Sequence, residues 1–454
     1  MIKPAYKALA LLCALALILS AAAPALQTAE AATASGLSVS TDTTASGLKL
    51  SASVSALSAS TDETTAVSSS SVSADEEFRA VWIAYYDFSP SKYSNAAEFT
   101  AYVDEMFDNV AAMNMNAVVV HVRPFSDAMY KSSYYPWSKY ASGTQGTDPG
   151  YDPLEIMITE AHARGLEFHA WLNPYRVTSS GTDPTALSKD NPARKYLTNS
   201  KTSDDRNVLA YHNALYYNPS KEAVRKLIVK GVKEIVKNYD VDGIHFDDYF
   251  YPAFSEDTYE TYFDAPEYEE YAAACEAAGT DCMSIVDWRK NNVNTLIKSV
   301  YSAIKKIDPD CVFGISPGGY IDYFDDDFRW YVDYRTWMSK KGYVDYICPQ
   351  LYWSFNTLNI YPYAEVLGKW ESVKRRSSVK LYVGLPAYKM NKDVNISTKR
   401  TYPDAEWYNQ FELANMVTYA RSTGQVRGYI FFDYADMVAA RNKTAVSYLM
   451  DVLD

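Results

Sequence analysis

Two adjacent carboxylates, Asp247 and Asp248, end an apolar run within the segment Asp242-Gly243-Ile244-His245-Phe246-Asp247-Asp248-Tyr249-Phe250-Tyr251-Pro252. Cleavage of a glycosidic bond needs an acid for the leaving oxygen and a second group that assists attack at the anomeric carbon. A neighbouring like charge raises the pKa of one carboxyl, which keeps it protonated near neutral pH. Because adjacent side chains point apart, we expect Asp433 or Asp127 to face Asp247 across the site. In the structural alternative, Asp248 only caps a turn.

Strand-like apolar runs alternate with amphipathic helical stretches eight times after Phe78, which predicts an α/β fold, a (β/α)8 barrel. A doubly wound sheet is the alternative, but no Gly-x-Gly-x-x-Gly follows the first strand. The predicted strands are Arg79–Tyr85, Ala117–Arg123, Glu167–Asn173, Gly243–Tyr249, Val312–Pro317, Tyr346–Tyr352, Leu381–Leu385 and Gly428–Asp433. The predicted helices include Phe99–Met113, Leu154–Arg164, Lys221–Tyr239, Trp288–Ile307, Ala364–Arg376 and Trp407–Arg421.

The connections from helix to strand are short, whereas three connections from strand to helix are long. They have roughly 25, 45 and 35 residues after the second, third and fourth strands, several times an ordinary loop. Connections of this second kind emerge at the C-terminal face of a barrel, where barrel enzymes keep their active sites. We therefore expect these long loops to form the walls of a groove on that face.

Polar residues recur at one parity near the C-terminal ends of five strands. Since side chains alternate along a strand, these residues are predicted to face the barrel interior, and burying several of them at one level is costly without a function. Asp248 is expected at the rim. The inward candidates are His121, Arg123, His169, Trp171, Asn173, His245, Asp247, Tyr249, Gln350, Tyr352 and Asp433.

Aromatic residues are abundant, with 40 Tyr and 9 Trp in the chain. Flat rings with a polar edge suit sugar rings, which have apolar faces and polar rims, although core packing explains single residues equally well. The candidates for sugar stacking are Trp137, Trp171, Trp353, Tyr175, Tyr249 and Tyr251. Arg123 and Arg176, which follow the second and third strands, are candidates for binding a substrate carboxylate or for tuning the pKa of the aspartates.

Seven segments together resemble the bacterial glycosyl hydrolase-like family ten. They are Phe78–Trp82, His121–Pro124, His169–Arg176, Asp242–Pro252, Ile315–Pro317, Pro349–Trp353 and Gly428–Phe432. The resemblance extends in order from Phe78 to about Met437. It implies a secreted or lipid-anchored (β/α)8 glycoside hydrolase that acts on cell-wall or extracellular polysaccharide. Peptidoglycan glycan strands or a related amino-sugar polymer are the implied substrates, and Asp247 and Asp248 the implied active-site carboxylates.

The same strand has a distant likeness to the Asp-Gly-x-Asp-x-Asp-x-Glu pattern of family 18 chitinases. Asp242, Gly243 and Asp247 match that pattern, but His245 stands where its second Asp would be and Tyr249 where its catalytic Glu would be. The chitinase assignment is therefore in doubt. On an N-acetylated substrate, the acetamido oxygen is an alternative nucleophile that one of the aspartates would orient.

Two other function classes compete with a carboxylate-dependent hydrolase. His121, His169 and His245, with Asp247, are of the type that holds Zn²⁺ in a metal-dependent hydrolase, although no His-x-His pair is present. In the second alternative, a non-catalytic sugar-binding barrel, the carboxylates only accept hydrogen bonds from hydroxyls. We expect the carboxylate-dependent hydrolase, with a polysaccharide or oligosaccharide as its partner and no metal or cofactor.

The N-terminal region predicts export. Residues 1–31 read as a signal peptide, 32–75 as a linker rich in Ser, Thr and Ala, and 76–454 as the barrel domain. We expect a protein that is secreted, with cell-wall association as a further option, and that has no membrane span once the signal is removed. The net charge of −13 argues against nucleic acid as a partner. Export permits a disulfide, for which Cys275 and Cys282 are candidates, whereas Cys311 and Cys348 read as buried thiols.

Overall fold

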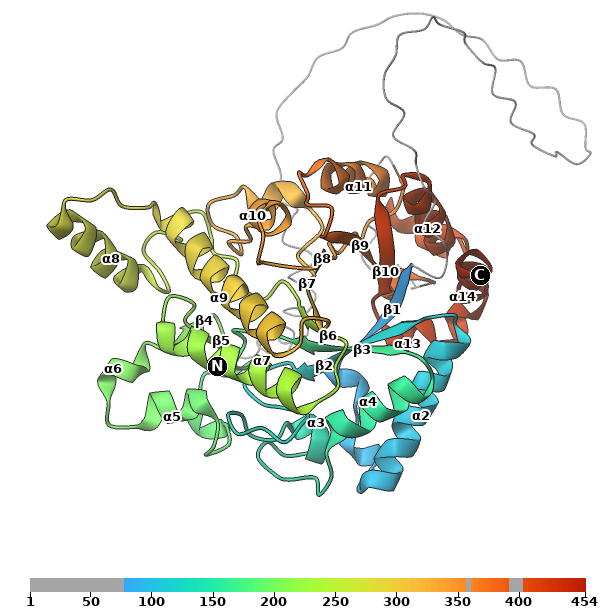
Figure 1. The fold of residues 1–454 in the computed structure, drawn as a ribbon, viewed down its shortest axis with the longest axis horizontal. Helices are drawn as coiled ribbons and strands as arrows, with labels where there is room; N and C mark the ends of the chain where they lie inside the picture. Colours follow the sequence, from blue (N-terminus) through green and yellow to red (C-terminus); the bar gives the residue numbers. More distant parts are fainter. Residues whose placement is uncertain (1–76, 357–360, 392–402) are drawn as a thin grey trace, which may run out of the picture. The chain divides into compact units, whose positions relative to one another are not determined.

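Eight parallel strands form a closed barrel, which confirms the predicted (β/α)8 architecture (Figure 1). The computed structural model describes residues 77–356, 361–391 and 403–454, so the predicted signal peptide and linker lie outside the described residues. The order around the barrel is β1-β10-β9-β8-β7-β6-β3-β2. The strands are β1 (Phe78–Ile83), β2 (Ala117–Arg123), β3 (Glu167–Leu172), β6 (Gly243–Phe246), β7 (Val312–Ile315), β8 (Tyr346–Ile347), β9 (Lys380–Leu385) and β10 (Val426–Phe431).

Helices follow the strands, and each of the six predicted helices is present with shifted ends. The predicted Trp407–Arg421 is the most altered, because a 3₁₀ turn (Pro403–Tyr408) precedes a helix that begins only at Glu412. The helices are α2 (Ala96–Ala112), α3 (Lys139–Ser142), α4 (Pro153–Ala163), α5 (Pro192–Thr198), α6 (Thr202–Asp205), α7 (Glu222–Asn238), α8 (Ala265–Ala278), α9 (Ile285–Ile307), α10 (Tyr334–Ser339), α11 (Tyr363–Ser372), α12 (Glu412–Ser422), α13 (Tyr434–Met437) and α14 (Lys443–Leu453).

Two apolar layers hold the barrel together. The first lies between strands and helices; on α7, for example, Val224, Ile228 and Val232 are buried at a spacing of four residues. The second fills the lumen, where the Phe78 and Tyr382 rings stack with centroids 4.7 Å apart. The lumen is therefore a packed core rather than a channel. Its buried apolar residues are Phe78, Ala80, Trp82, Ala84, Ala117, Val119, Trp171, Tyr346, Cys348, Tyr382 and Ile430.

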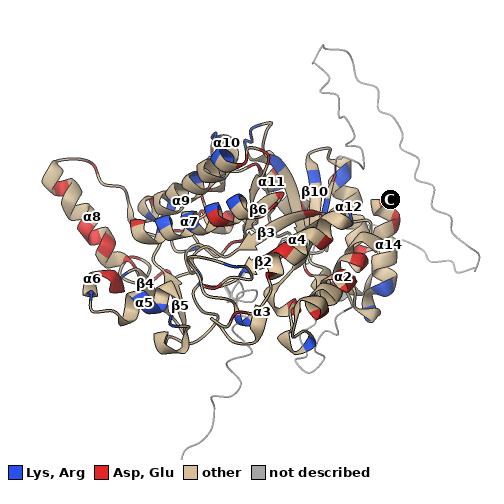
Figure 2. Ribbon diagram, turned by 60° about the horizontal axis from the view of Figure 1, so that its bottom comes forward, with Lys and Arg blue, Asp and Glu red and all other residues tan. Residues whose placement is uncertain are grey.

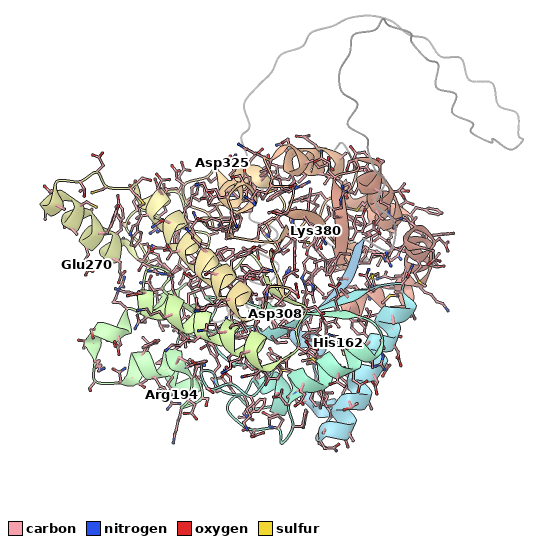
Figure 3. All side chains as sticks on the ribbon, viewed as in Figure 1. His162, Arg194, Glu270, Asp308, Asp325 and Lys380 are labelled. Carbon is pink, nitrogen blue, oxygen red and sulfur yellow. The ribbon has the colours of Figure 1, made fainter. Side chains whose placement is uncertain are left out.

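At the N-terminal face, short turns lead from helices into the strands that follow them. The side chains of Asn116, Asp242 and Asp345, each just before a strand, accept a hydrogen bond from a backbone N–H of the adjacent strand, at 2.7–2.8 Å. Asp242 also contacts His162 at 2.9 Å; Figure 3 labels His162 at the end of α4. This face is built for stability.

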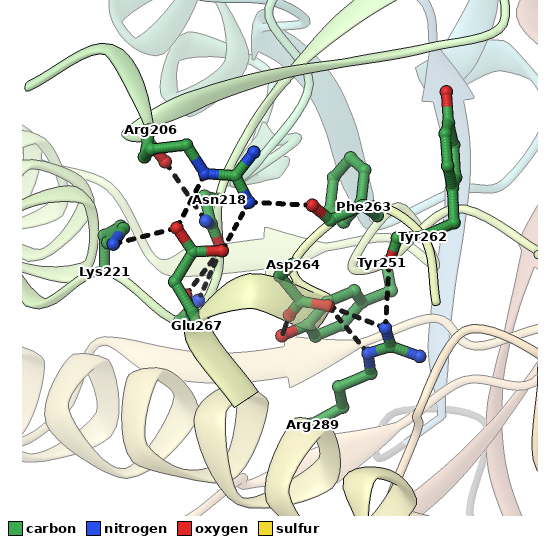
Figure 4. A network of polar contacts seen from close by, with 10 residues as sticks. Arg206, Asn218, Lys221, Tyr251, Tyr262, Phe263, Asp264, Glu267 and Arg289 are labelled. Carbon is green, nitrogen blue, oxygen red and sulfur yellow. Dashed lines mark hydrogen bonds and ion pairs between the residues drawn. The ribbon is translucent and has the colours of Figure 1, made fainter. Parts of the chain in front are cut away.

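The long loops lie at the opposite face, as predicted. The loop after β3 contains a hairpin that we did not predict, formed by β4 (Val208–Tyr211) and β5 (Ala214–Tyr217). The loop after β6 contains α8, whose first turn is anchored through ion pairs (Figure 4). Asp264 pairs with Arg289 at 2.8 Å, both fully buried. Glu267 pairs with Arg206 and with Lys221.

Helix α8 carries acidic residues, and alanines make up much of its later turns. The acidic positions on the ribbon of α8 are red in Figure 2, and they are Glu267, Glu269, Glu270 and Glu276. Only Ala265 and Glu267 of this helix are buried, so tertiary packing supports little of its length. Separately, none of the described helices is long and apolar enough to span a lipid bilayer.

Candidate active site

Strand β6 carries Asp247 and Asp248 to the C-terminal rim of the barrel, called the mouth below. Asp247 is 3% exposed and continues the inward parity of His245. Its carboxylate accepts hydrogen bonds from the indole N–H of Trp171 at 3.1 Å and from the backbone N–H of Tyr249 at 3.3 Å. Asp248 is partly buried and accepts a hydrogen bond from the side chain of Gln350. The two carboxylates are thus held by different neighbours.

Burial raises the pKa of both carboxyl groups. The pKa of Asp247 rises well above its usual value because of burial and the neighbouring charge of Asp248. Burial raises the pKa of Asp248 to about 6, against the lowering effects of Arg176 and of the Gln350 hydrogen bond. Because the two charges repel each other, the pair retains a proton near neutral pH. One protonated and one ionised carboxyl is the state that glycosidic cleavage requires.

Arg176, in the loop after β3, brings a positive charge to the mouth. Its guanidinium carbon lies 4.4 Å from the ring centroid of Tyr249 and 5.2 Å from that of Phe125. The charge of Arg176 lowers the pKa of both Asp247 and Asp248. The predicted role in tuning the aspartates thus agrees with the electrostatics, whereas binding of a substrate carboxylate stays a prediction.

His121 and Trp171 form a stacked pair beside the aspartates. Their rings are 3.7 Å apart and 9° from parallel. His121 is 2% exposed, and burial together with the Arg176 charge lowers its pKa well below the usual value, so the ring is neutral. Within the described residues, neither nitrogen of His121 has a hydrogen-bond partner. The buried ring therefore carries one donor and one acceptor that no described residue satisfies.

The residues after β8 cover the other side of Asp248. The side-chain amide of Gln350 donates to the Ser316 carbonyl at 3.1 Å, which fixes its position. The backbone is closely packed here, since a Cβ on Gly319 would lie 2.1 Å from the Gln350 carbonyl oxygen. Tyr352 stacks on Phe432 at 6.1 Å, and Trp353 packs against neighbouring rings. Sugar contacts from Gln350, Tyr352 and Trp353 stay predictions.

Two predicted histidines are enclosed in the lumen. His245 accepts from the Trp82 indole N–H at 3.2 Å and bonds the Tyr346 hydroxyl at 2.9 Å, so both of its nitrogens are occupied. His169 bonds the same hydroxyl at 3.1 Å and Glu167 at 3.3 Å. Their predicted sugar contacts are therefore wrong in this structure. In the described part of the chain, no three His, Cys, Asp or Glu side chains are grouped to hold a metal, so the zinc reading lacks its ligand set.

Arg123 also departs from its predicted position. A bulge in the pairing of β2 with β3, between His121 and Arg123, alters the inward parity. The guanidinium lies over the Tyr135 ring at 4.6 Å, and a Cβ on Gly231 of α7 would be 3.6 Å from it. Arg123 thus packs beneath α7, and its predicted contact with substrate is wrong. Asn173 is buried too and donates to the Pro124 carbonyl at 3.1 Å.

The predicted partner carboxylates have other contacts. Asp433 caps α13 by accepting from the Asp436 backbone N–H and accepts the Tyr86 hydroxyl at 2.7 Å. Asp127 is 1% exposed, and burial raises its pKa to about 6 while Gln145 donates to it at 3.2 Å. In the described part of the chain, neither forms a hydrogen bond or ion pair with Asp247.

The residues directly after β1 also lie at the mouth, although they are not among the predicted site residues. Tyr85 lies 5.4 Å from His121, ring to ring, and Tyr86 bonds Asp433. Burial and the Asp433 charge raise the pKa of Asp87 to about 7. The signal was available, since Tyr85-Tyr86-Asp87 follows an apolar strand in the same way as the other polar strand ends.

Three further stacking candidates differ in exposure. Tyr175 and Tyr251 are buried, at 0% and 1% exposed, so neither presents a face to a sugar. Trp137 is partly exposed. Two hollows on the surface of the described residues, of about 450 and 580 Å³, are lined by neither Asp247 nor Asp248. The site is defined by converging polar side chains at the mouth rather than by one of these hollows.

Comparison with known proteins places the chain in a family. Residues 77–402 match the model of the glycosyl hydrolase-like 10 family. Glycosyl hydrolase YngK of Bacillus subtilis is 40% identical over 380 residues, covering 80% of this chain and 69% of the relative. Glycosyl hydrolase DigH of Escherichia coli K12 is 32% identical over 410 residues, covering 82% and 87%.

A solved structure supports the fold alone. The PgaB (BpsB) glycoside hydrolase domain from Bordetella bronchiseptica is 14% identical, covers 83% of this chain and 99% of that domain, and has a TM-score of 0.51. With the closed barrel, the carboxylate pair and these relatives, the reading as a binding-only barrel is set aside. The chain belongs to the glycosyl hydrolase-like 10 family and is a glycoside hydrolase.

Proposed function

We propose that this enzyme cleaves glycosidic bonds in a bacterial cell-wall or extracellular polysaccharide, with an amino-sugar polymer such as the peptidoglycan glycan strand as its substrate. The observation that carries the chemistry is the pair of carboxyl groups with raised pKa values at the mouth, positioned by Trp171, Gln350 and Arg176. The protonated member of the pair donates to the leaving oxygen. The ionised member activates or orients the attacking group, which is water or the substrate acetamido oxygen.

Polar and aromatic groups around the pair support a sugar substrate. The nitrogens of His121 are unpartnered in the described residues, and the Tyr249 ring lies beneath Arg176. The rim cation Arg176 favours a glycan that carries carboxylates, such as the lactyl groups of muramic acid. The relatives are named glycosyl hydrolases without a substrate, so the polymer assignment is our own.

We also propose that the enzyme acts outside the cell. Support comes from residues 1–31, which have a basic start, an apolar run and Ala-x-Ala exits. The test is fractionation of cells that express the full chain, followed by N-terminal sequencing of the secreted form. Retention of the uncleaved chain in the cytosol would reject this location without affecting the proposed chemistry.

Product analysis tests the reaction. Purified enzyme is incubated with peptidoglycan glycan strands, with chitin-type oligomers and with neutral glucans, and the products are separated by mass. We expect products from the glycan strands, and an activity loss of about 10²–10⁴-fold for Asp247→Asn and for Asp248→Asn, with binding retained. The matched control is Asp190→Asn, because the Asp190 side chain is 82% exposed.

The outcomes separate substrate from mechanism. Turnover of neutral glucans alone would remove the amino-sugar proposal but keep the site. Wild-type turnover by Asp247→Asn and Asp248→Asn would remove the site. If the wild-type enzyme binds the strands and releases no product, the proposed polymer is wrong.

A further inference from the structure

The chain turns back on itself at the C-terminal end of α8. Gly279 adopts a left-handed conformation with φ of +64°, and the Thr280 N–H donates to the Cys275 carbonyl at 3.0 Å. Farther along, the Met283 N–H donates to the Tyr271 hydroxyl at 3.1 Å. The Tyr268 hydroxyl donates to the Met283 carbonyl at 2.9 Å. Residues 280–284, called the return segment below, therefore lie along the last turns of α8.

This turn brings two accessible thiols together. Cys275 on α8 and Cys282 on the return segment are hydrogen-bonded to each other, and the Cys282 thiol also lies 3.6 Å from the Ala272 carbonyl. Cys275 is partly exposed and Cys282 is exposed. The remaining described thiols, Cys311 and Cys348, are buried, with exposed fractions of 1% and 0%. An oxidant in solvent can therefore reach Cys275 and Cys282, whereas Cys311 and Cys348 are shielded from it.

We propose that Cys275 and Cys282 form a disulfide that fastens the return segment to α8. The Cys275 thiolate attacks a disulfide oxidant RSSR, forming a mixed disulfide and releasing RS⁻. The Cys282 thiolate then attacks the Cys275 sulfur, forming the protein disulfide and releasing a second RS⁻. The two protons of the thiols go to the two released thiolates, and the two electrons reduce the oxidant to two RSH.

The surroundings favour Cys275 as the first nucleophile. The Tyr271 hydroxyl donates a hydrogen bond to its sulfur, which lowers the pKa of this thiol. The hydrogen bond between the two thiols, in turn, raises the pKa of Cys282. Since thiolates react and thiols do not, Cys275 enters the exchange and Cys282 completes it.

The link would stabilise a part of the molecule that has few other contacts. The ion pairs of Asp264 and Glu267 hold only the first turn of α8. The hollow of about 450 Å³ is lined by Tyr268 of α8, by Ser284 of the return segment and by Ile285. A disulfide between Cys275 and Cys282 would hold the helix and the return segment together beside these residues.

Thiol mapping of the full chain tests the proposal. The protein is equilibrated with oxidised or with reduced glutathione, alkylated without denaturation, and mapped by peptide mass. After oxidation we expect neither thiol to be alkylated, and one cross-linked species that has lost two hydrogens. After reduction both are alkylated. Cys311 and Cys348 serve as internal controls and react only after denaturation.

Two variants make the result specific. In Cys275→Ser and in Cys282→Ser, the remaining thiol should be alkylated or carry glutathione, with no cross-link. Proteolysis within 279–284 should be several-fold faster in both variants, and in reduced wild-type protein, than in oxidised wild-type protein, at unchanged melting of the barrel.

Thiols that both stay alkylable after oxidation would overturn the proposal, as would links to Cys311 or Cys348 or between chains. Equal proteolysis in all forms would show that the bond fastens nothing. None of these readouts needs export or turnover, so their failure is distinct from failure of the proposed function.

Discussion

The indole N–H of Trp171 donates a hydrogen bond to the Asp247 carboxylate at 3.1 Å. Trp171 is in turn covered by the His121 ring, 3.7 Å away and nearly parallel. A neutral histidine on one strand thus holds the ring of a second strand, which orients the carboxylate on a third. The bond favours the ionised form of Asp247 and lowers its pKa against the effect of burial.

Trp171→Phe should raise the pKa of Asp247 further. A hydrogen bond to a charged group contributes roughly 1.5–3 kcal/mol, so the shift is on the order of one pH unit or more. If Asp247 reacts as the acid, the alkaline limb of kcat/KM moves to higher pH. If it reacts ionised, the acidic limb moves to higher pH instead. The pH–rate profile thereby assigns its role, and an unchanged profile would contradict the coupling.

Arg176→Gln should raise the pKa of both aspartates, because it removes the cation that lowers them. The pH optimum then moves upward as a whole. Arg176→Lys keeps a charge but loses the planar stacking on Tyr249. Its pH optimum should therefore lie between those of the wild-type enzyme and Arg176→Gln. Profiles measured on one oligosaccharide at low and high salt check this; equal optima for the three proteins would remove Arg176 from the electrostatics of the site.

Tyr346→Phe should destabilise the barrel rather than the chemistry. The lost hydroxyl bonds both His169 and His245, so two buried imidazoles lose a partner, at a cost of about 1–3 kcal/mol. The matched control is Tyr382→Phe, since no hydrogen bond of the Tyr382 hydroxyl is recorded among the described residues. Urea denaturation measures the difference. Equal midpoints for the two variants would mean that the lumen network contributes nothing.

Asp87→Asn should stabilise the protein at alkaline pH. The pKa of Asp87 in the folded protein is about 7, above the value near 4 of an unfolded chain. Its contribution to stability is complete below about pH 4 and is lost as pH rises through 7. The melting temperature of the variant should therefore exceed that of the wild-type protein at pH 8 and equal it at pH 4. A difference in melting temperature that is the same at both pH values would mean that titration of Asp87 is not its cause. The control Asp190→Asn should show no difference at either pH.

The strands were predictable because their signal is local. All eight lie in apolar runs, helices lead into the later strands through short turns, and the inward parity of His245 and Asp247 holds in the structure. Arg123 was misplaced because a single-residue shift in strand pairing leaves no trace in an alternating pattern.

Other errors came from what the lumen and loops contain. A barrel interior can bury histidines when neighbouring strands supply their partners, as Tyr346 does, and that pairing is visible only in three dimensions. The β4–β5 hairpin was missed because its strands have four residues each and its turn lacks glycine; His212 adopts a φ of +48° there. Asp433 does follow the C-terminal end of β10, but its carboxylate caps α13 and accepts from Tyr86, a use of a strand end that the sequence pattern does not reveal.

The side chains of Asn116, Asp242 and Asp345 tie neighbouring strands at the N-terminal face, far along each strand from the reacting groups. Durability and reactivity are therefore supplied by opposite ends of the same strands. Grafting a foreign loop onto the catalytic end would leave those ties untouched, which makes this barrel a suitable scaffold for altering which glycans are cut.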